Sequence, residues 1–220
     1  MKVWSIDEID IDKLSYSVPK SNAMGGQSVY LDIPSDDPKQ SKLVFQTPKC
    51  YLPFGLNEFV PAGGAPKYSM DLSLSGNTPA MEKFSEFIGK LDATNIEKAV
   101  SNSSTWFKKK LETDVVTELY RPQLRKSNKG FPPTFKVKFP TKNNEFLGDI
   151  FDVNKRPIAM SQITKGCTVQ AIVECVGMYF VAREFGVTWR VVQVMVYPNE
   201  KLKNYSFIES DDETEDAEPM

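Results

Sequence analysis

Cationic and aromatic residues gather in one part of this sequence, between residues 106 and 142. This stretch holds ten cations against three anions, a net charge of +7, together with six aromatic side chains. Cations follow the phosphates of a single nucleic-acid strand, and each base stacked on a flat side chain contributes roughly 1 to 3 kcal/mol. The combination favours binding of a single strand without reading its sequence.

Strand periodicity separates the phosphate-binding candidates from the core within residues 134–139. Side chains on a strand alternate between two faces, so Lys136 and Lys138 share one face. Phe135 and Phe139 lie on the opposite face and are predicted to be core residues. The two lysines are the strongest individual candidates for phosphate contacts.

The remaining candidates lie in looser segments or on later strands. Three aromatic residues lie beside cations in the sequence: Trp106, Phe107 and Tyr120. Two interpretations stay open for them, base stacking by at least one of the three or burial in the core. For Trp189, a structural role is favoured over base stacking. Arg183 could line a groove or be an ordinary solvated charge, and the sequence favours neither interpretation. The predicted DNA-binding residues are Lys108, Lys109, Lys110, Tyr120, Arg121, Arg125, Lys126, Lys136, Lys138, Arg183 and Trp189.

The last twelve residues, 209–220, hold seven carboxylates and no cation. The rest of the chain carries 27 cations against 22 anions, or +5. An acidic tail on a basic body can compete for a cationic groove or bind a basic partner protein, and a disordered solubilising tail is the open alternative. The predicted partner-binding residues are Asp211, Asp212, Glu213, Glu215, Asp216 and Glu218.

The absence of histidine excludes several enzyme classes. It removes Ser-His and Cys-His nucleophile activation and the H-E-x-x-H zinc motif. The acids Asp149, Asp152 and Glu174 are interpreted as scattered surface charges and not as a metal site. Three cysteines without C-x-x-C spacing predict small buried residues, with neither a disulfide framework nor a zinc site. We expect a protein that is not an enzyme and has no cofactor or metal.

Three regions are predicted along the chain. Residues 1–40 form a partly ordered polar leader, residues 41–208 form one domain, and residues 209–220 form a disordered acidic tail. The sequence lacks an apolar run of about 18 residues and a signal-peptide pattern. These features predict a soluble intracellular protein without a membrane partner.

The expected elements are strands around one helical section. Residues 67–75 alternate with period two and predict a half-buried strand. Thr78 is expected to cap a helix that begins at Pro79, and residues 92–100 are expected to continue it after a turn. Strands at 166–175, 177–183 and 186–197 predict an antiparallel meander. This order favours a mainly β fold of the OB type, a small curved antiparallel barrel with an inserted α-helical segment.

A set of segments resembles a known family of viral proteins. They are residues 49–56, 68–75, 163–174 and 185–189, together with the acidic C-terminus. With these, residues 43–220 resemble the replicative single-stranded DNA-binding proteins of nucleocytoplasmic large DNA viruses, which are similar to those of short-tailed phages. The resemblance implies an OB-fold, cooperative binding of single-stranded DNA in replication, recombination and repair, and a tail that recruits polymerase or helicase. It also implies a site of action in the host nucleus or at a cytoplasmic viral replication site.

One departure from that family lies at the C-terminus. The phage tails end in an aromatic residue, and this chain ends in Pro219-Met220. Two alternatives stay open: an acidic-tailed interaction or chaperone-type protein that binds basic partners, and a nucleic-acid enzyme with carboxylate-bound metal. Strand edges and the polar leader also leave a homodimer open.

Overall fold

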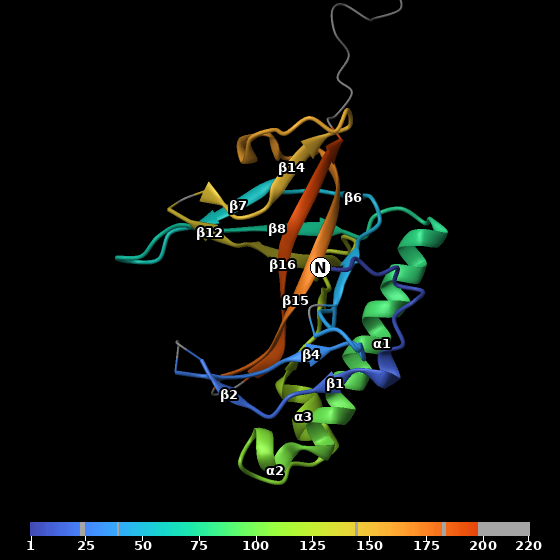
Figure 1. Ribbon diagram of the computed structural model, residues 1–220, viewed down its shortest axis with the longest axis vertical. Coiled ribbons are helices and arrows are strands. Elements are labelled where there is room, and N and C mark those ends of the chain that lie inside the picture. The colour runs from blue at the N-terminus through green and yellow to red at the C-terminus, as the bar shows by residue number, and fades with distance from the viewer. Residues whose placement is uncertain (23–24, 39, 144, 182–183, 198–220) are drawn as a thin grey trace, which may run out of the picture.

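The computed structural model describes residues 1–22, 25–38, 40–143, 145–181 and 184–197. Within them the fold is mainly β, which confirms the predicted class. Figure 1 shows two long strands, β15 and β16, crossing a set of shorter strands, with α1 packed along one side. The predicted acidic tail and Arg183 lie outside the described residues.

The helices and strands in the described residues have the following bounds. The helices are α1 (Pro79–Ser101), α2 (Ser103–Trp106) and α3 (Thr113–Leu119), with 3-10 helices at Ile11–Lys13 and Met160–Gln162. The strands are β1 (Ser15–Tyr16), β2 (Lys20–Ser21), β3 (Gln27–Val29), β4 (Leu31–Asp32), β5 (Val44–Gln46), β6 (Cys50–Tyr51), β7 (Leu56–Phe59), β8 (Lys67–Ser73), β9 (Tyr120–Arg121), β10 (Leu124–Arg125), β11 (Thr134–Phe139), β12 (Thr141–Lys142), β13 (Glu145–Phe146), β14 (Asp149–Asp152), β15 (Thr168–Val181) and β16 (Glu184–Tyr197).

The central strands pair in a closed ring. β8 pairs antiparallel with β11, which meets β16 through a parallel pair between Lys138 and Arg190. β16 pairs antiparallel with β15 over nearly its whole length. β15 meets β6 at Tyr51, and Tyr51 also pairs with Ser73 of β8, so the ring returns to its start. The apolar faces of these strands therefore enclose one core.

The late strands differ from the predicted meander. Residues 168–181 form one strand where the sequence predicted a break before Gly177. Gly177 instead lies at a bulge, with a φ of 132°. A Cβ added there would lie 2.8 Å from the carbonyl oxygen of Val29, which pairs with the same strand through β3. The glycine therefore bends a continuous strand and lets another strand approach closely.

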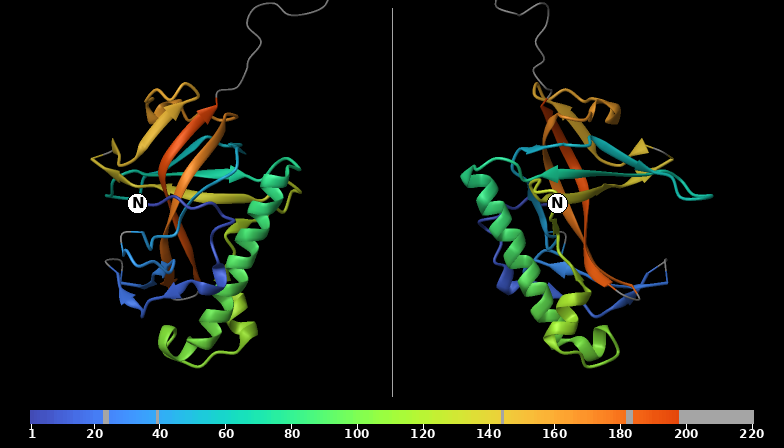
Figure 2. Two further views of the ribbon diagram at one scale, coloured as in Figure 1. Left: turned by 45° about the vertical axis from the view of Figure 1, so that its right-hand side comes forward. Right: turned by 180° about the vertical axis from the view of Figure 1, so that it is seen from behind.

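Helix α1 closes one side of the ring (Figure 2). The Thr78 side chain accepts a hydrogen bond from the Met81 amide, as its predicted cap role requires. The helix continues to Ser101, so the predicted turn after Leu91 is wrong. Phe84 packs edge-to-face on Phe45 and Phe135. Since these rings come from helix, early strand and late strand, the helix is part of the core.

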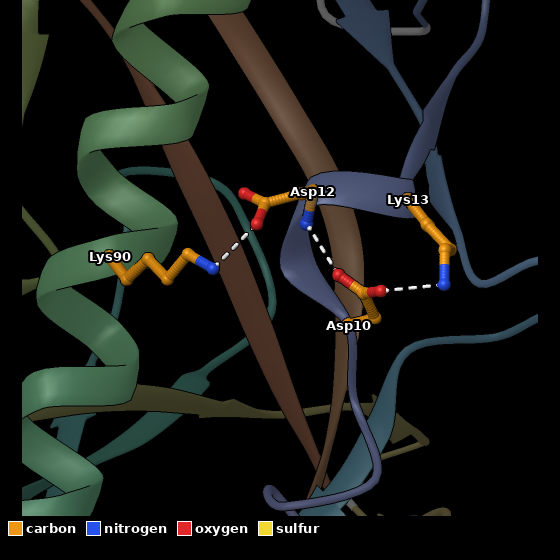
Figure 3. A network of polar contacts seen from close by, with 4 residues as sticks. All are labelled: Asp10, Asp12, Lys13 and Lys90. Carbon is orange, nitrogen blue, oxygen red and sulfur yellow. Dashed lines mark hydrogen bonds and ion pairs between the residues drawn. The ribbon is translucent and has the colours of Figure 1, made fainter.

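The leader packs into this same core. Ile9, Ile11 and Leu14 are buried against it, and β3 pairs with β15. Figure 3 shows that the leader also contacts α1, where the Lys90 ammonium lies 2.8 Å from the Asp12 carboxylate. Exposed ion pairs of this kind contribute little to stability, so burial of the apolar side chains holds the leader in place.

The cysteines are buried, as their sequence pattern predicted. Cys50, Cys167 and Cys175 are at most 4% exposed and are free thiols. Burial raises the pKa of Cys50 and Cys175 to about 12, which keeps both thiols protonated and unreactive. Among the described residues, no helix is both long and apolar enough to cross a membrane.

Candidate nucleic-acid interface

A groove of about 1000 Å³ opens between the segment 121–126, β11 and the β15–β16 end of the barrel. Residues of β9, β10, β11 and β16 make up most of its lining, and Asn22 and Gly26 also line it. The residues that line it are Asn22, Gly26, Arg121, Pro122, Gln123, Leu124, Arg125, Lys126, Lys136, Lys138, Tyr179, Val181, Glu184, Val187, Thr188 and Trp189.

The groove lining is strongly cationic. It holds five of the cations predicted to bind DNA and one anion, Glu184. These five cations are Arg121, Arg125, Lys126, Lys136 and Lys138. A concave surface lined by one sign of charge concentrates ligands of the opposite sign. The geometry therefore suits a polyanion that is narrow enough to enter the groove.

Strand geometry fixes the spacing of the lysines. Lys136 and Lys138 point away from the core, while Phe135 and Phe139 are buried at 0% and 4% exposure, which confirms the predicted alternation. Arg125 lies directly opposite Thr134, on the face that carries both lysines. Loss of water around the Lys138 ammonium lowers its pKa, and repulsion by Lys136, Lys67 and Arg125 lowers it further. The cations therefore lie close enough to repel one another.

A buried hydrogen-bond network holds the segment 121–126 against the barrel. The Asp92 carboxylate of α1 accepts hydrogen bonds from the Gln123 amide at 3.1 Å and from the Gln123 side chain at 2.7 Å. It also accepts one from the Tyr120 hydroxyl at 2.5 Å. The side-chain Oε1 of Gln123 in turn accepts a hydrogen bond from Trp189 Nε1 at 2.5 Å. One helix residue thus binds Tyr120, just before the segment, and Gln123, in its middle.

Burial sets the protonation states within this network. Desolvation raises the pKa of Asp92, and the hydrogen bonds from Tyr120 and Gln123 oppose that shift. Burial, followed by the charge of Asp92, raises the pKa of Tyr120 far above its ordinary value. Tyr120 therefore stays protonated at neutral pH and can donate its proton to the Asp92 carboxylate.

The predicted stacking aromatics are core residues, so these predictions are corrected. Tyr120 is 4% exposed, Trp106 is 5% exposed and Trp189 is 2% exposed. Phe107 is partly buried and packs on the rings of Phe180 and Phe185. Burial of apolar area in the core therefore leaves Tyr120, Trp106 and Trp189 almost no exposed ring surface on which a base could stack. Trp189 is nevertheless one of the residues that line the groove.

The lysine triplet lies outside the groove. Lys108, Lys109 and Lys110 are exposed in the connection between α2 and α3, and Lys108 adopts a φ of 56°. They are not among the residues that line the groove. These lysines were predicted to bind DNA because they are close in sequence to the other cations. In the fold they lie outside the groove that those cations line.

Glu184 pairs with a cation inside the groove. Its carboxylate accepts a hydrogen bond from Arg121 Nε at 2.6 Å and from the Tyr179 hydroxyl at 3.4 Å. Partial burial and the Glu184 charge raise the pKa of Tyr179, so its hydroxyl stays protonated. The Arg121 guanidinium is therefore partly neutralised in the unbound protein.

The sequence did not reveal these supporting residues. Asp92 and Gln123 are 31 positions apart, and neither belongs to a motif. Tyr179 lies near the end of β15 and Glu184 begins β16. Only the pairing of β9 with β16 brings Arg121 to them.

The acids considered for a metal site each have another partner. The Arg190 guanidinium lies 2.7 Å from the Glu174 carboxylate. Asp149 accepts a hydrogen bond from Gln193, and Asp152 accepts bonds from backbone amides of its own turn. Within the described part of the chain, no group of three or more His, Cys, Asp or Glu side chains is placed to hold a metal ion.

Comparison with known proteins shows the family to which this chain belongs. A family of unknown function, DUF5871, matches residues 80–209. The chain belongs to this family. The matched region begins at α1 and contains Asp92, β9 to β11 and both long strands, so it holds most of the groove.

A viral protein is similar in sequence over most of the chain. The uncharacterized protein L291 of Acanthamoeba polyphaga mimivirus is 31% identical over 179 residues. The match covers 78% of this chain and 28% of that protein, so the chain spans less than a third of its relative's length.

Two solved structures of phage proteins are similar to this chain to different degrees. The single-stranded DNA-binding protein gp2.5 encoded by bacteriophage T7 has a TM-score of 0.53 at 15% identity, over 77% of this chain and 99% of that chain. The single-stranded DNA-binding protein from bacteriophage Enc34, in complex with single-stranded DNA, has a TM-score of 0.39 at 11% identity, over 84% of this chain and 96% of that one. The likeness to the T7 protein is one of fold.

Proposed function

We propose that this DUF5871 protein binds single-stranded DNA without reading its sequence, and that it is not an enzyme. The observation that carries the proposal is the groove, which gathers five cations and one anion around a space of about 1000 Å³. Phosphates of a single strand would lie against Lys136, Lys138 and Arg125. Such binding releases counterions and weakens as salt rises.

We further propose that the closed ring is a barrel of the OB type, with α1 as the inserted helical segment. Two features support this assignment: the ring order β6, β8, β11, β16, β15 and the likeness in fold to the T7 protein. OB barrels bind oligonucleotides on one exposed strand face and its bordering loops. The groove beside β11 would occupy that position.

The proposal includes a role in viral DNA replication, recombination and repair, at the host nucleus or a cytoplasmic replication site. A viral relative supports it. The acidic residues 209–220 would compete for the groove at the high effective concentration of a tethered ligand. When DNA displaces them, Asp211, Asp212 and their neighbours would become available to a replicative polymerase or helicase.

The test is a titration with oligo(dT) and with duplex DNA at several salt concentrations, using the full chain and a chain that stops after Ile208. We expect micromolar or tighter binding to the single strand and weaker binding to duplex. If each groove cation neutralises one phosphate, the slope of log K against log salt is about −3.5. Removal of the tail should tighten binding.

The two halves of the proposal have separate failure outcomes. Equal affinity for duplex and single strand would contradict the single-strand assignment. Unchanged affinity after truncation would contradict the proposal that the tail competes with DNA, and it would not affect the proposal that the groove binds DNA. Binding of a basic protein by the tail, without any DNA binding, would favour the alternative interaction protein.

A further inference from the structure

An exposed aromatic side chain lies just beyond the groove. Phe59 ends β7 and is 64% exposed. It pairs directly with Lys67, the first residue of β8. Figure 1 shows the connection between β7 and β8 extending beyond the rest of the sheet. A single exposed phenylalanine is ordinary in itself, so its neighbours decide what it can do.

Register places Phe59 on the same face of the sheet as the groove lysines. Residues directly opposite on paired strands point to the same face, so Phe59 shares a face with Lys67. Lys67 shares that face with Ser69, which lies opposite Lys138 on β11. An independent contact agrees: Asn57 Nδ2 of β7 donates to the Asp71 carboxylate of β8 at 3.0 Å.

The charge around Phe59 joins it to the groove. Lys67 lies two residues along β8 from Ser69, the partner of Lys138, and its charge contributes to lowering the pKa of Lys138. Adjacent strands are about 4.8 Å apart, which puts β7 about 10 Å from β11 across β8. A strand that leaves the groove over Lys138 would therefore reach Phe59 within one or two nucleotides.

We propose that Phe59 is a base-stacking platform that extends the DNA site out of the groove, with Lys67 binding the adjoining phosphate. This inference rests on the proposed single-stranded DNA binding and specifies the path of the strand. The ring is exposed and lies opposite Lys67 on β8, and an exposed aromatic beside a cation is the combination that holds bases of a single strand. The buried aromatics Tyr120 and Trp189 do not supply such a platform.

The test compares Phe59→Ala with Phe54→Ala in the full chain. Phe54 is a matched control, since it is 62% exposed and lies in the bend before β7, where Gly55 adjoins Thr164 and Lys165. We expect Phe59→Ala to weaken binding of oligo(dT) of roughly 16 nucleotides by about fivefold or more. An oligomer of roughly 4 nucleotides, which fills only the groove, should lose much less. Phe54→Ala should change neither.

A fluorescence measurement separates stacking from a loss of structure. In a Phe59→Trp variant, long oligo(dT) should quench the added emission, and the same change at Phe54 should not respond. If Phe59→Ala leaves the affinity unchanged for every oligonucleotide length, Phe59 is not a stacking platform, and the proposed function is unaffected. Absence of binding by the wild type would overturn the proposed function itself.

Discussion

Two lysine- and arginine-rich segments lie close together in the chain and have different surroundings in the fold. The segment 121–126 is held through its Gln123, which bonds to Asp92 and Trp189, and its Arg121, Arg125 and Lys126 side chains line the groove. The lysine triplet 108–110 occupies a connection between short helices. There the Leu111 amide bonds to Ser103 Oγ at 3.3 Å.

The difference shows that cation density alone does not define a binding surface. Both segments have the composition of a nucleic-acid site, and only one is held at the edge of a concave surface. A partly buried acid that accepts several hydrogen bonds fixes a turn more firmly than a single bond to a hydroxyl does. The cations beyond that turn are thereby pre-organised for a ligand.

The largest expected effect comes from removing the support of the segment 121–126. Asp92→Ala leaves the Tyr120 hydroxyl and two Gln123 donors without their acceptor, at a cost of about 2 to 3 kcal/mol in the free energy of unfolding. Urea denaturation measures this loss. Asp7→Ala removes an exposed acid paired with Lys83 and should leave the midpoint unchanged. Equal effects would show that the network does not stabilise the turn.

The second effect concerns the groove itself. Lys136→Ala combined with Lys138→Ala should weaken binding of every oligonucleotide sequence by about tenfold. Because two phosphate contacts are lost, the salt slope should fall by about 1.4. Circular dichroism should show an unchanged fold, since both side chains point away from the core. Unchanged affinity would place the DNA path elsewhere.

A smaller effect, of opposite sign, is expected at the groove anion. Glu184→Gln frees the Arg121 guanidinium from its carboxylate partner and removes the groove's one negative charge among its lining residues. Binding of oligo(dT) should tighten about twofold to fivefold. Glu97→Gln, on α1 outside the groove lining, serves as the control of equal charge change. Weaker binding by the Glu184 variant would mean that this acid orients Arg121 for DNA.

The smallest effect is expected at the lysine triplet. Lys108→Ala, Lys109→Ala and Lys110→Ala together remove more charge than the β11 pair, yet should reduce affinity by less than about twofold at physiological salt because exposed distant charges are screened. The same titration measures both variants. A loss of affinity equal to that of the Lys136 and Lys138 double variant would show that the lysine triplet also contributes to the binding surface.

The sequence predicted the local features well. Alternation in residues 134–139 gave the correct faces for Lys136 and Phe135, and Thr78 caps the helix as expected. The same reasoning failed at Gly177, because a glycine looks alike in a turn and in a bulge. It left stacking open at Tyr120, which is buried, because an aromatic beside a cation gives no sign of which way its ring points. Trp189 is buried too, as the structural role favoured for it requires.

The sequence by itself determined which side chains could bind a polyanion, since charge and strand periodicity are properties of neighbours in the chain. The tertiary structure decided which of them meet. Arg121 reaches Glu184 only because β9 pairs with β16, and Phe59 reaches the cationic face only through the register of β7, β8 and β11. Pairings between distant segments depend on how the whole core packs, and no local pattern encodes them.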